Sequence, residues 1–130
     1  MPISPHSLIK GARPTDPLDL LLVNAPLRDY ALRPRVNDYT LPVLGMAYIA
    51  THAATQGHNV AVLDAEAHGL PVAVTINAIN QLAPRWVGLN LLAPTYDISA
   101  GIAAALDPGT RLMAGVAPYL AGKSVGLHGW

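Results

Sequence analysis

The stretch Leu18-Asp19-Leu20-Leu21-Leu22-Val23-Asn24 decides the fold that the sequence predicts. This short apolar run stops at Ala25-Pro26, and such a run is typical of a strand buried on both faces of a sheet. Strands of this kind occur mainly in parallel sheets that carry helices on both sides. We therefore interpret 18–24 as the first strand of an α/β protein.

Predicted strands and helices alternate along the rest of the chain. Short apolar runs predict further strands at 59–63, 86–92 and 111–114. Apolar residues at helical spacing predict helices at 44–55, 71–82 and 95–106. This alternation predicts a flavodoxin-like (Rossmann-like), doubly wound parallel sheet with strand order 2-1-3-4. Only fifteen residues follow Gly115, so we expect the fifth strand of such a unit to be missing or vestigial.

The length of 130 residues suits one domain. We expect a flexible, proline-rich N-terminal segment at 1–17, a single domain at 18–118 and a short C-terminal tail at 119–130. The segment 27–42 is long for a strand-to-helix connection, and loops of that length often bind a ligand or a partner. Solvation of its charged side chains would explain the same composition.

The charge balance argues against several classes of partner. Charged residues make up 12% of the chain, and eight basic residues balance eight acidic ones without forming a block. We therefore expect no nucleic-acid partner and no polybasic membrane patch. The sequence has neither a secretory signal pattern nor an apolar run long enough to span a membrane, so a cytoplasmic protein is expected.

The chain contains no cysteine. It therefore cannot form a disulfide, supply a thiolate nucleophile or ligate an iron–sulfur cluster. No strand is followed by a glycine-rich phosphate-binding motif, and no Ser-His-Asp arrangement can be placed. The acidic turn with Asp64, Glu66 and His68 could serve a metal site or a small-ligand enzyme, but three close residues without a distant fourth ligand favour a solvated turn.

Several segments occur together in an order that resembles one known family. They are Leu21–Pro26 (LLVNAP), Leu41–Ala50 (LPVLGMAYIA), Gly57–Val60 (GHNV), Val62–Asp64 (VLD), Trp86–Asn90 (WVGLN) and Ala93–Tyr96 (APTY). Over about 19–118 the chain resembles the N-terminal cobalamin (B12)-binding domain of B12-dependent radical SAM enzymes. The resemblance implies a cobalamin cofactor at the carboxyl ends of the strands, where ligands bind in this architecture.

The resemblance places the cofactor-binding residues in the loops at that edge. They are Asn24, Pro26, Asn90, Leu92, Thr95, Tyr96, Gly115 and Pro118. Capping of the following helix is an alternative role for Thr95.

The sequence departs from the wider group of cobalamin domains at two points. The loop after the first strand, Asn24–Asp29, lacks the Asp-x-His-x-x-Gly motif whose histidine coordinates cobalt, so no metal ligand is assigned. Radical SAM relatives commonly lack that histidine too. The family's Gly-Gly pair after the fourth strand reads Gly115-Val116 here, and a β-branched side chain fills space that a second glycine would leave open.

The resemblance implies a cobalamin-binding module without its own catalytic domain. The family's radical SAM domain carries a Cys-x-x-x-Cys-x-x-Cys motif, which this chain lacks, so the chain is not expected to be an enzyme alone. It would act as the cofactor-binding part of a methyltransferase, with a radical SAM catalytic chain or domain as partner. The alternative is a non-catalytic flavodoxin-like interaction module, or a truncated remnant that has lost the ligand. The oligomeric state stays open.

Overall fold

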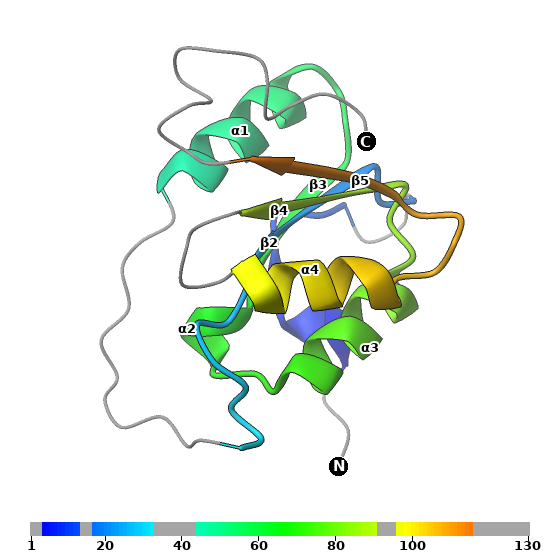
Figure 1. The fold of residues 1–130 in the computed structure, drawn as a ribbon. Helices are drawn as coiled ribbons and strands as arrows, with labels where there is room; N and C mark the ends of the chain where they lie inside the picture. Colours follow the sequence, from blue (N-terminus) through cyan, green and yellow to red (C-terminus); the bar gives the residue numbers. More distant parts are fainter. Residues whose placement is uncertain (1–3, 14–16, 33–43, 91–95, 116–130) are drawn as a thin grey trace.

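The structure is a computed structural model that describes residues 4–13, 17–32, 44–90 and 96–115 (Figure 1). Its strands are β1 (Ile9–Lys10), β2 (Leu20–Asn24), β3 (Val60–Asp64), β4 (Trp86–Asn90) and β5 (Arg111–Gly115). Its helices are the 3-10 turn η1 (Pro5–Ser7) and α1 (Leu44–Thr55), α2 (Ala65–His68), α3 (Val72–Leu82) and α4 (Tyr96–Ala105).

The described strands form one mixed sheet in the order β1-β3-β2-β4-β5. The pairs β3·β2, β2·β4 and β4·β5 are parallel, and β1 runs antiparallel to β3. The predicted α/β class with a mainly parallel sheet is therefore confirmed, and the arrangement fits a Rossmann-like fold in its coarse features.

The predicted four-strand order 2-1-3-4 is wrong for the sheet as a whole, because the sheet has a strand that the sequence analysis did not predict. Ile9 and Lys10 pair with Leu63 and Val62 and place β1 at the outer edge, beyond β3. They belong to the segment 1–17, which was expected to be a flexible lead-in. Two residues are too few to show the alternation by which a strand is recognised in a sequence.

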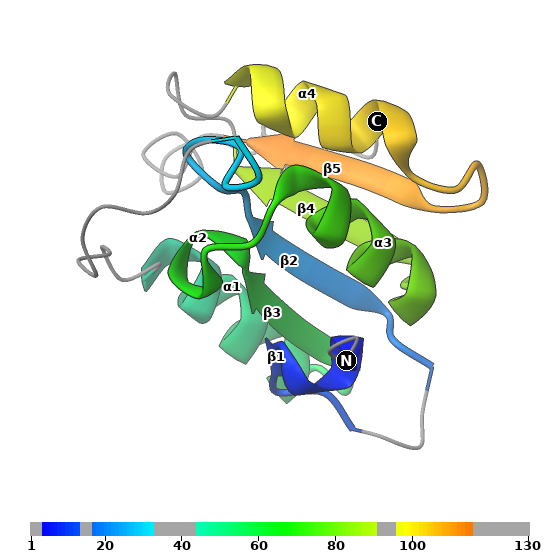
Figure 2. The same ribbon diagram turned by 90° about the horizontal axis from the view of Figure 1, so that it is seen from below.

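Helices cover both faces of the sheet. The helix α1 lies on one face, and α3 and α4 lie on the other (Figures 1 and 2). The main core sits on the α3/α4 face, where alternate residues of the central strands pack against apolar side chains of both helices. This cluster includes Leu21, Val23, Ala61, Leu63, Val87, Leu89, Ile79 and Ile102. Full burial of each larger aliphatic side chain contributes about 1.5–3 kcal/mol.

The face under α1 depends on a close contact between β2 and β4. A Cβ atom on Gly88 would lie 2.7 Å from Cδ2 of Leu22, closer than real Cβ contacts allow. Leu22 is 4% exposed. The missing side chain at Gly88 therefore lets Leu22 lie across the neighbouring strand and close this part of the sheet face.

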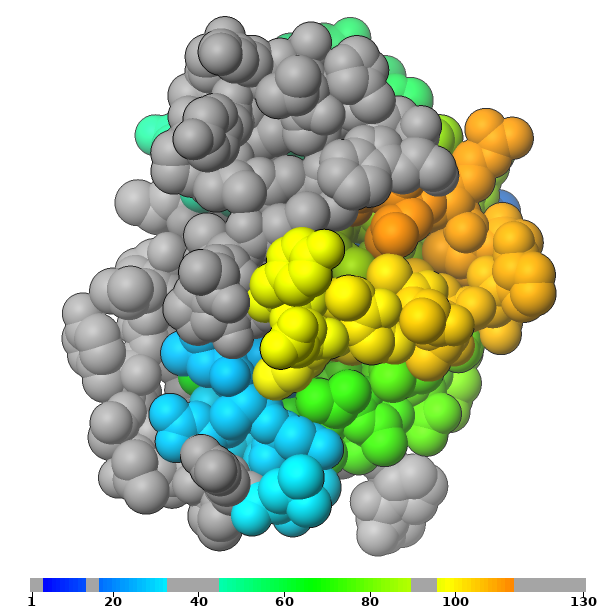
Figure 3. All heavy atoms as spheres, in the orientation of Figure 1, coloured from blue at the N-terminus to red at the C-terminus, as the bar shows by residue number. Residues whose placement is uncertain are grey.

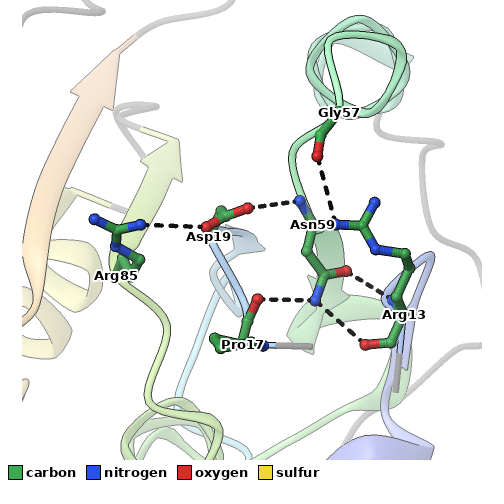
Figure 4. A network of polar contacts seen from close by, with 6 residues as sticks. All are labelled: Arg13, Pro17, Asp19, Gly57, Asn59 and Arg85. Carbon is green, nitrogen blue, oxygen red and sulfur yellow. Dashed lines mark hydrogen bonds and ion pairs between the residues drawn. The ribbon is translucent and has the colours of Figure 1, made fainter. Parts of the chain in front are cut away.

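Buried Asn59 ties the N-terminal segment to the sheet (Figure 4). Its side chain is only 2% exposed and makes three hydrogen bonds. The Nδ2 group donates to the carbonyls of Pro17 (3.0 Å) and Arg13 (3.3 Å), and Oδ1 accepts the Arg13 N–H (2.7 Å). The Asn59 N–H donates to Oδ2 of Asp19 at 2.8 Å. One residue thus joins the starts of β2 and β3 to the chain that follows β1.

Substitution of Asn59 by alanine should lower the free energy of unfolding by about 2 kcal/mol, because it removes three hydrogen bonds made by a side chain that is itself buried. Urea unfolding followed by circular dichroism measures the change. Asn77→Ala is the matched control, since Asn77 is exposed on α3 and its loss should change stability by less than about 0.5 kcal/mol. Equal effects of the two substitutions would contradict the role given to Asn59.

Candidate functional site

The carboxyl ends of the parallel strands meet at one edge of the sheet. The strand register places Asn24 beside Asp64 and Asn90 beside Gly115, and the pair Val23–Leu89 joins β2 to β4 just before they end. Three predicted site positions, Asn24, Asn90 and Gly115, therefore end adjacent strands along this carboxyl edge. The structure brings them together through backbone pairing alone.

The other predicted site residues divide into two groups. Pro26 follows β2 and is buried, and Tyr96 begins α4 with 58% of its surface exposed. The remaining three, Leu92, Thr95 and Pro118, lie outside the described residues. Cofactor contact by any of these residues stays a prediction.

The start of α4 belongs to the same edge as the strand ends. In Figure 1 the arrowheads of β4 and β5 and the first turn of α4 lie on the same side of the molecule. The first turn of a helix has backbone N–H groups without partners inside the helix, and these suit hydrogen-bond acceptors on a ligand. The edge thus combines an exposed phenol, backbone N–H groups and the glycine that ends β5.

Asn24 has a structural contact at this edge. The residue is 9% exposed, and its Nδ2 donates to Oδ1 of Asp64 at 2.9 Å. The same Asp64 oxygen accepts the N–H of Ala67 at 3.0 Å and so caps α2. The amide of Asn24 therefore holds the end of β2 to the end of β3 and to the helix that begins there.

Glu66 anchors the chain that follows β2, a role that the sequence analysis missed. Its Oε1 accepts the Leu27 N–H at 2.7 Å, and the Tyr30 hydroxyl lies 2.8 Å from Oε1 and 2.7 Å from Oε2. A second contact holds the same segment to α3, because Oδ1 of Asp29 accepts the Val72 N–H at 3.1 Å. These partners are 36 to 43 residues apart, so no local pattern reveals them.

The predicted solvated turn at 64–69 is instead the short helix α2. It begins at the cap Asp64 and ends at Gly69, whose φ of 63° lies in the left-handed region that glycine tolerates. Among the described residues no group of three His, Cys, Asp or Glu side chains could hold a metal ion. Asp64 and Glu66 both accept backbone hydrogen bonds, and the bond to Glu66 holds the chain that follows β2 in place.

His68 lies on α2, which follows β3 and also contacts β2. It lines a cavity of about 480 Å³ at the opposite margin of the sheet, together with Lys10, Thr51 and Val62. The walls of this cavity come from α1, α2, β1 and β3. The position of His68 agrees with a place at the sheet margin, with β3 between it and the central strands.

Comparisons with known proteins give no family for the chain: no family model, curated protein or solved structure matched it. Within the described residues, no helix has the length and apolar character needed to cross a membrane.

Replacing Glu66 with alanine should release the segment after β2 and speed hydrogen exchange of the Leu27 amide by about tenfold, because a charge-assisted hydrogen bond is lost. Tyr30→Phe is the matched control: it removes one hydroxyl but keeps the bond from Leu27 to Glu66. Amide exchange followed by NMR measures both variants. If Leu27 exchanged at the same rate in all three proteins, Glu66 would not anchor this segment.

Proposed function

We propose that this chain is a cobalamin-binding module that holds the cofactor over the carboxyl ends of β2, β4 and β5. The observation that carries the proposal is the switch point of the sheet. From β2 the chain crosses to β3 on one side, and it then returns to β4 on the other side of β2. Ligands of open α/β sheets bind outside the strand ends at this reversal. The reversal lies between the ends of β2 and β4, which belong to the edge at which the family resemblance implies a cofactor.

The chemical groups at this edge suit a ligand with many neutral polar groups. The corrin ring of cobalamin carries amide side chains, which pair with hydroxyl and backbone groups. The described groups that could meet them are the Tyr96 hydroxyl, the N–H groups of the first turn of α4 and the backbone of Gly115. Pro26 adds a buried, rigid start to the β2 loop.

The chain would contribute binding and orientation. When bound, cobalamin supplies the methyl-transfer chemistry of its cobalt, and the protein positions the cofactor and excludes water. No described residue at the edge is assigned as a cobalt ligand, because the only histidine on α2, His68, lines the cavity at the other margin. A radical SAM catalytic chain or domain would be the partner that supplies the iron–sulfur cluster.

Tyr96→Ala should reduce the affinity for hydroxocobalamin by about tenfold, the effect of losing about 1.4 kcal/mol of contact energy. The visible spectrum of protein-bound cofactor after desalting, titrated over cofactor concentration, measures the affinity. Tyr48→Ala is the matched control, because Tyr48 is 77% exposed on α1, on the other face of the sheet. Equal affinity of the two variants would move the ligand away from α4, and no retention by the unmodified chain would reject the proposed function.

His68→Ala should leave the spectrum of bound cobalamin unchanged. His68 is exposed and faces the cavity beside β1 and β3, so it cannot serve as the lower cobalt ligand of a cofactor over β2 and β4. Comparison of the visible spectra of the two proteins, each loaded with hydroxocobalamin, checks this. Disappearance of a histidine-ligated spectrum in the variant would place the cofactor at the β1/β3 margin instead.

A specific observation favours a second candidate, a non-catalytic interaction module. The segment 25–32 and the start of α4 lie side by side on one face of the molecule (Figure 3). They carry three of the exposed large hydrophobic side chains, Leu27 (46%), Leu32 (80%) and Tyr96 (58%). Exposed apolar groups that gather on one face are typical of protein contacts. The desalting experiment separates the candidates, because only a cobalamin module retains the cofactor.

A further inference from the structure

The last strand of the described sheet, β5, has one side without a described partner strand. On its inner side the Arg111 N–H donates to the Arg85 carbonyl at 3.0 Å. In a β-strand the N–H and C=O of one residue point to the same side, and those of the next residue point to the other. Arg111, Met113 and Gly115 therefore bond toward β4, whereas Leu112 and Ala114 present two N–H and two C=O groups to the outer edge.

Among the described residues, this edge lacks the features that usually protect an edge strand against pairing. Natural edge strands are often very short or carry lysine or proline. At the other margin β1 follows this rule, with two residues of which one is the exposed Lys10. By contrast β5 has five residues, no proline and one charge, and the guanidinium of that Arg111 lies over the Trp86 ring, 5.6 Å from its centroid. Of the two margins, β5 is the one suited to pairing.

The helix beside β5 also carries no charge along most of its length. In Figure 2, α4 runs next to β5 at this margin of the sheet. Between Ile98 and Leu106 no residue is charged, and the exposed residues there are all alanine or glycine. They are Ala100, Gly101, Ala104 and Ala105. A chain that pairs with β5 would therefore meet small, uncharged side chains on the α4 side.

We propose that β5 pairs antiparallel with β5 of a second copy of this chain, across a twofold axis at Met113. In this register Leu112 faces Ala114 of the partner subunit. Leu112 and the partner subunit's Ala114 then form two backbone hydrogen bonds with each other. The twofold axis gives the same two bonds between Ala114 and the partner subunit's Leu112, so all four outward groups on each copy are paired.

The charges of β5 agree with this self-pairing. The only charged residue of the strand, Arg111, faces the partner subunit's Gly115, so no like charges stand opposite each other. The net charge of zero adds no general repulsion between copies. The inference is independent of cobalamin, since the cofactor edge and the β5 edge are different sides of the sheet.

Hydrogen exchange within one strand tests the proposal, measured by NMR on the full chain at several protein concentrations. The amides of Leu112 and Ala114 should exchange more slowly as concentration rises, while the amides of Arg111 and Met113 stay protected throughout as an internal control. Light scattering should show a mass rising toward twice 13.6 kDa over the same range. If the amides of Leu112 and Ala114 were protected at every concentration and the mass stayed that of a monomer, another segment of the same chain would cover the edge. If these amides exchanged fast at all concentrations, no chain would pair with the edge. Either result overturns the proposal.

Two variants at one position sharpen the test. Ala114→Pro removes an outward N–H but none of the bonds toward β4, so it should abolish the dimer and keep the far-UV circular dichroism of the unmodified chain. Ala114→Gly is the matched control, because it keeps the N–H and should still dimerise. A dimer that survives Ala114→Pro would exclude pairing through β5. If that variant failed to fold, the exchange pattern of the unmodified chain would decide.

Discussion

The structure depends on the parallel pairing of β2 with two neighbours at once. Leu20 pairs with Val60 on one side and with Trp86 on the other, and the register continues along both strands. A slip by one residue would move Leu21 and Val23 from the α3/α4 core to the opposite face of the sheet. Pairing on both sides of β2 fixes β3 and β4 relative to each other, although these two strands are not neighbours in the sheet. It also aligns the strand ends that form the candidate site.

The two ends of the sheet meet different physical requirements. At the amino end, the buried side chain of Asn59 donates to the Pro17 carbonyl, and Asp19 accepts the backbone N–H of Asn59. At the carboxyl end, Asp64 and Glu66 accept backbone N–H groups of α2 and of the chain after β2 at exposed positions, and Asn24 donates to Asp64. Both polar networks are structural. The groups left for a ligand are those near the switch point, toward β4, β5 and α4.

The sequence predicts the parts of the fold that local patterns encode. The helix predicted at 44–55 coincides with α1, and the four long strands begin and end within two residues of their predicted bounds where the structure describes them. The strand β1 was missed because pairing with β3 creates it, and two residues carry no periodic pattern. The contacts of Glu66 were missed for a related reason, since Leu27 and Tyr30 are far from it along the chain. The positions of Leu92, Thr95 and Pro118, outside the described residues, stay predictions.

The composition of the chain and the topology of its sheet both agree with the proposal that the chain binds a cofactor and the cofactor supplies the chemistry. The chain contains no cysteine, and its described residues hold no group of three side chains that could bind a metal ion. What the fold does supply is a rigid edge at a switch point, held by backbone pairing and by buried hydrogen bonds. In the proposed function, this edge would position a cofactor that brings its own chemistry. The outer side of β5, which has no partner strand among the described residues, is a separate property of the same sheet. The proposed cofactor binding and the proposed self-association therefore rest on different features and can be tested independently.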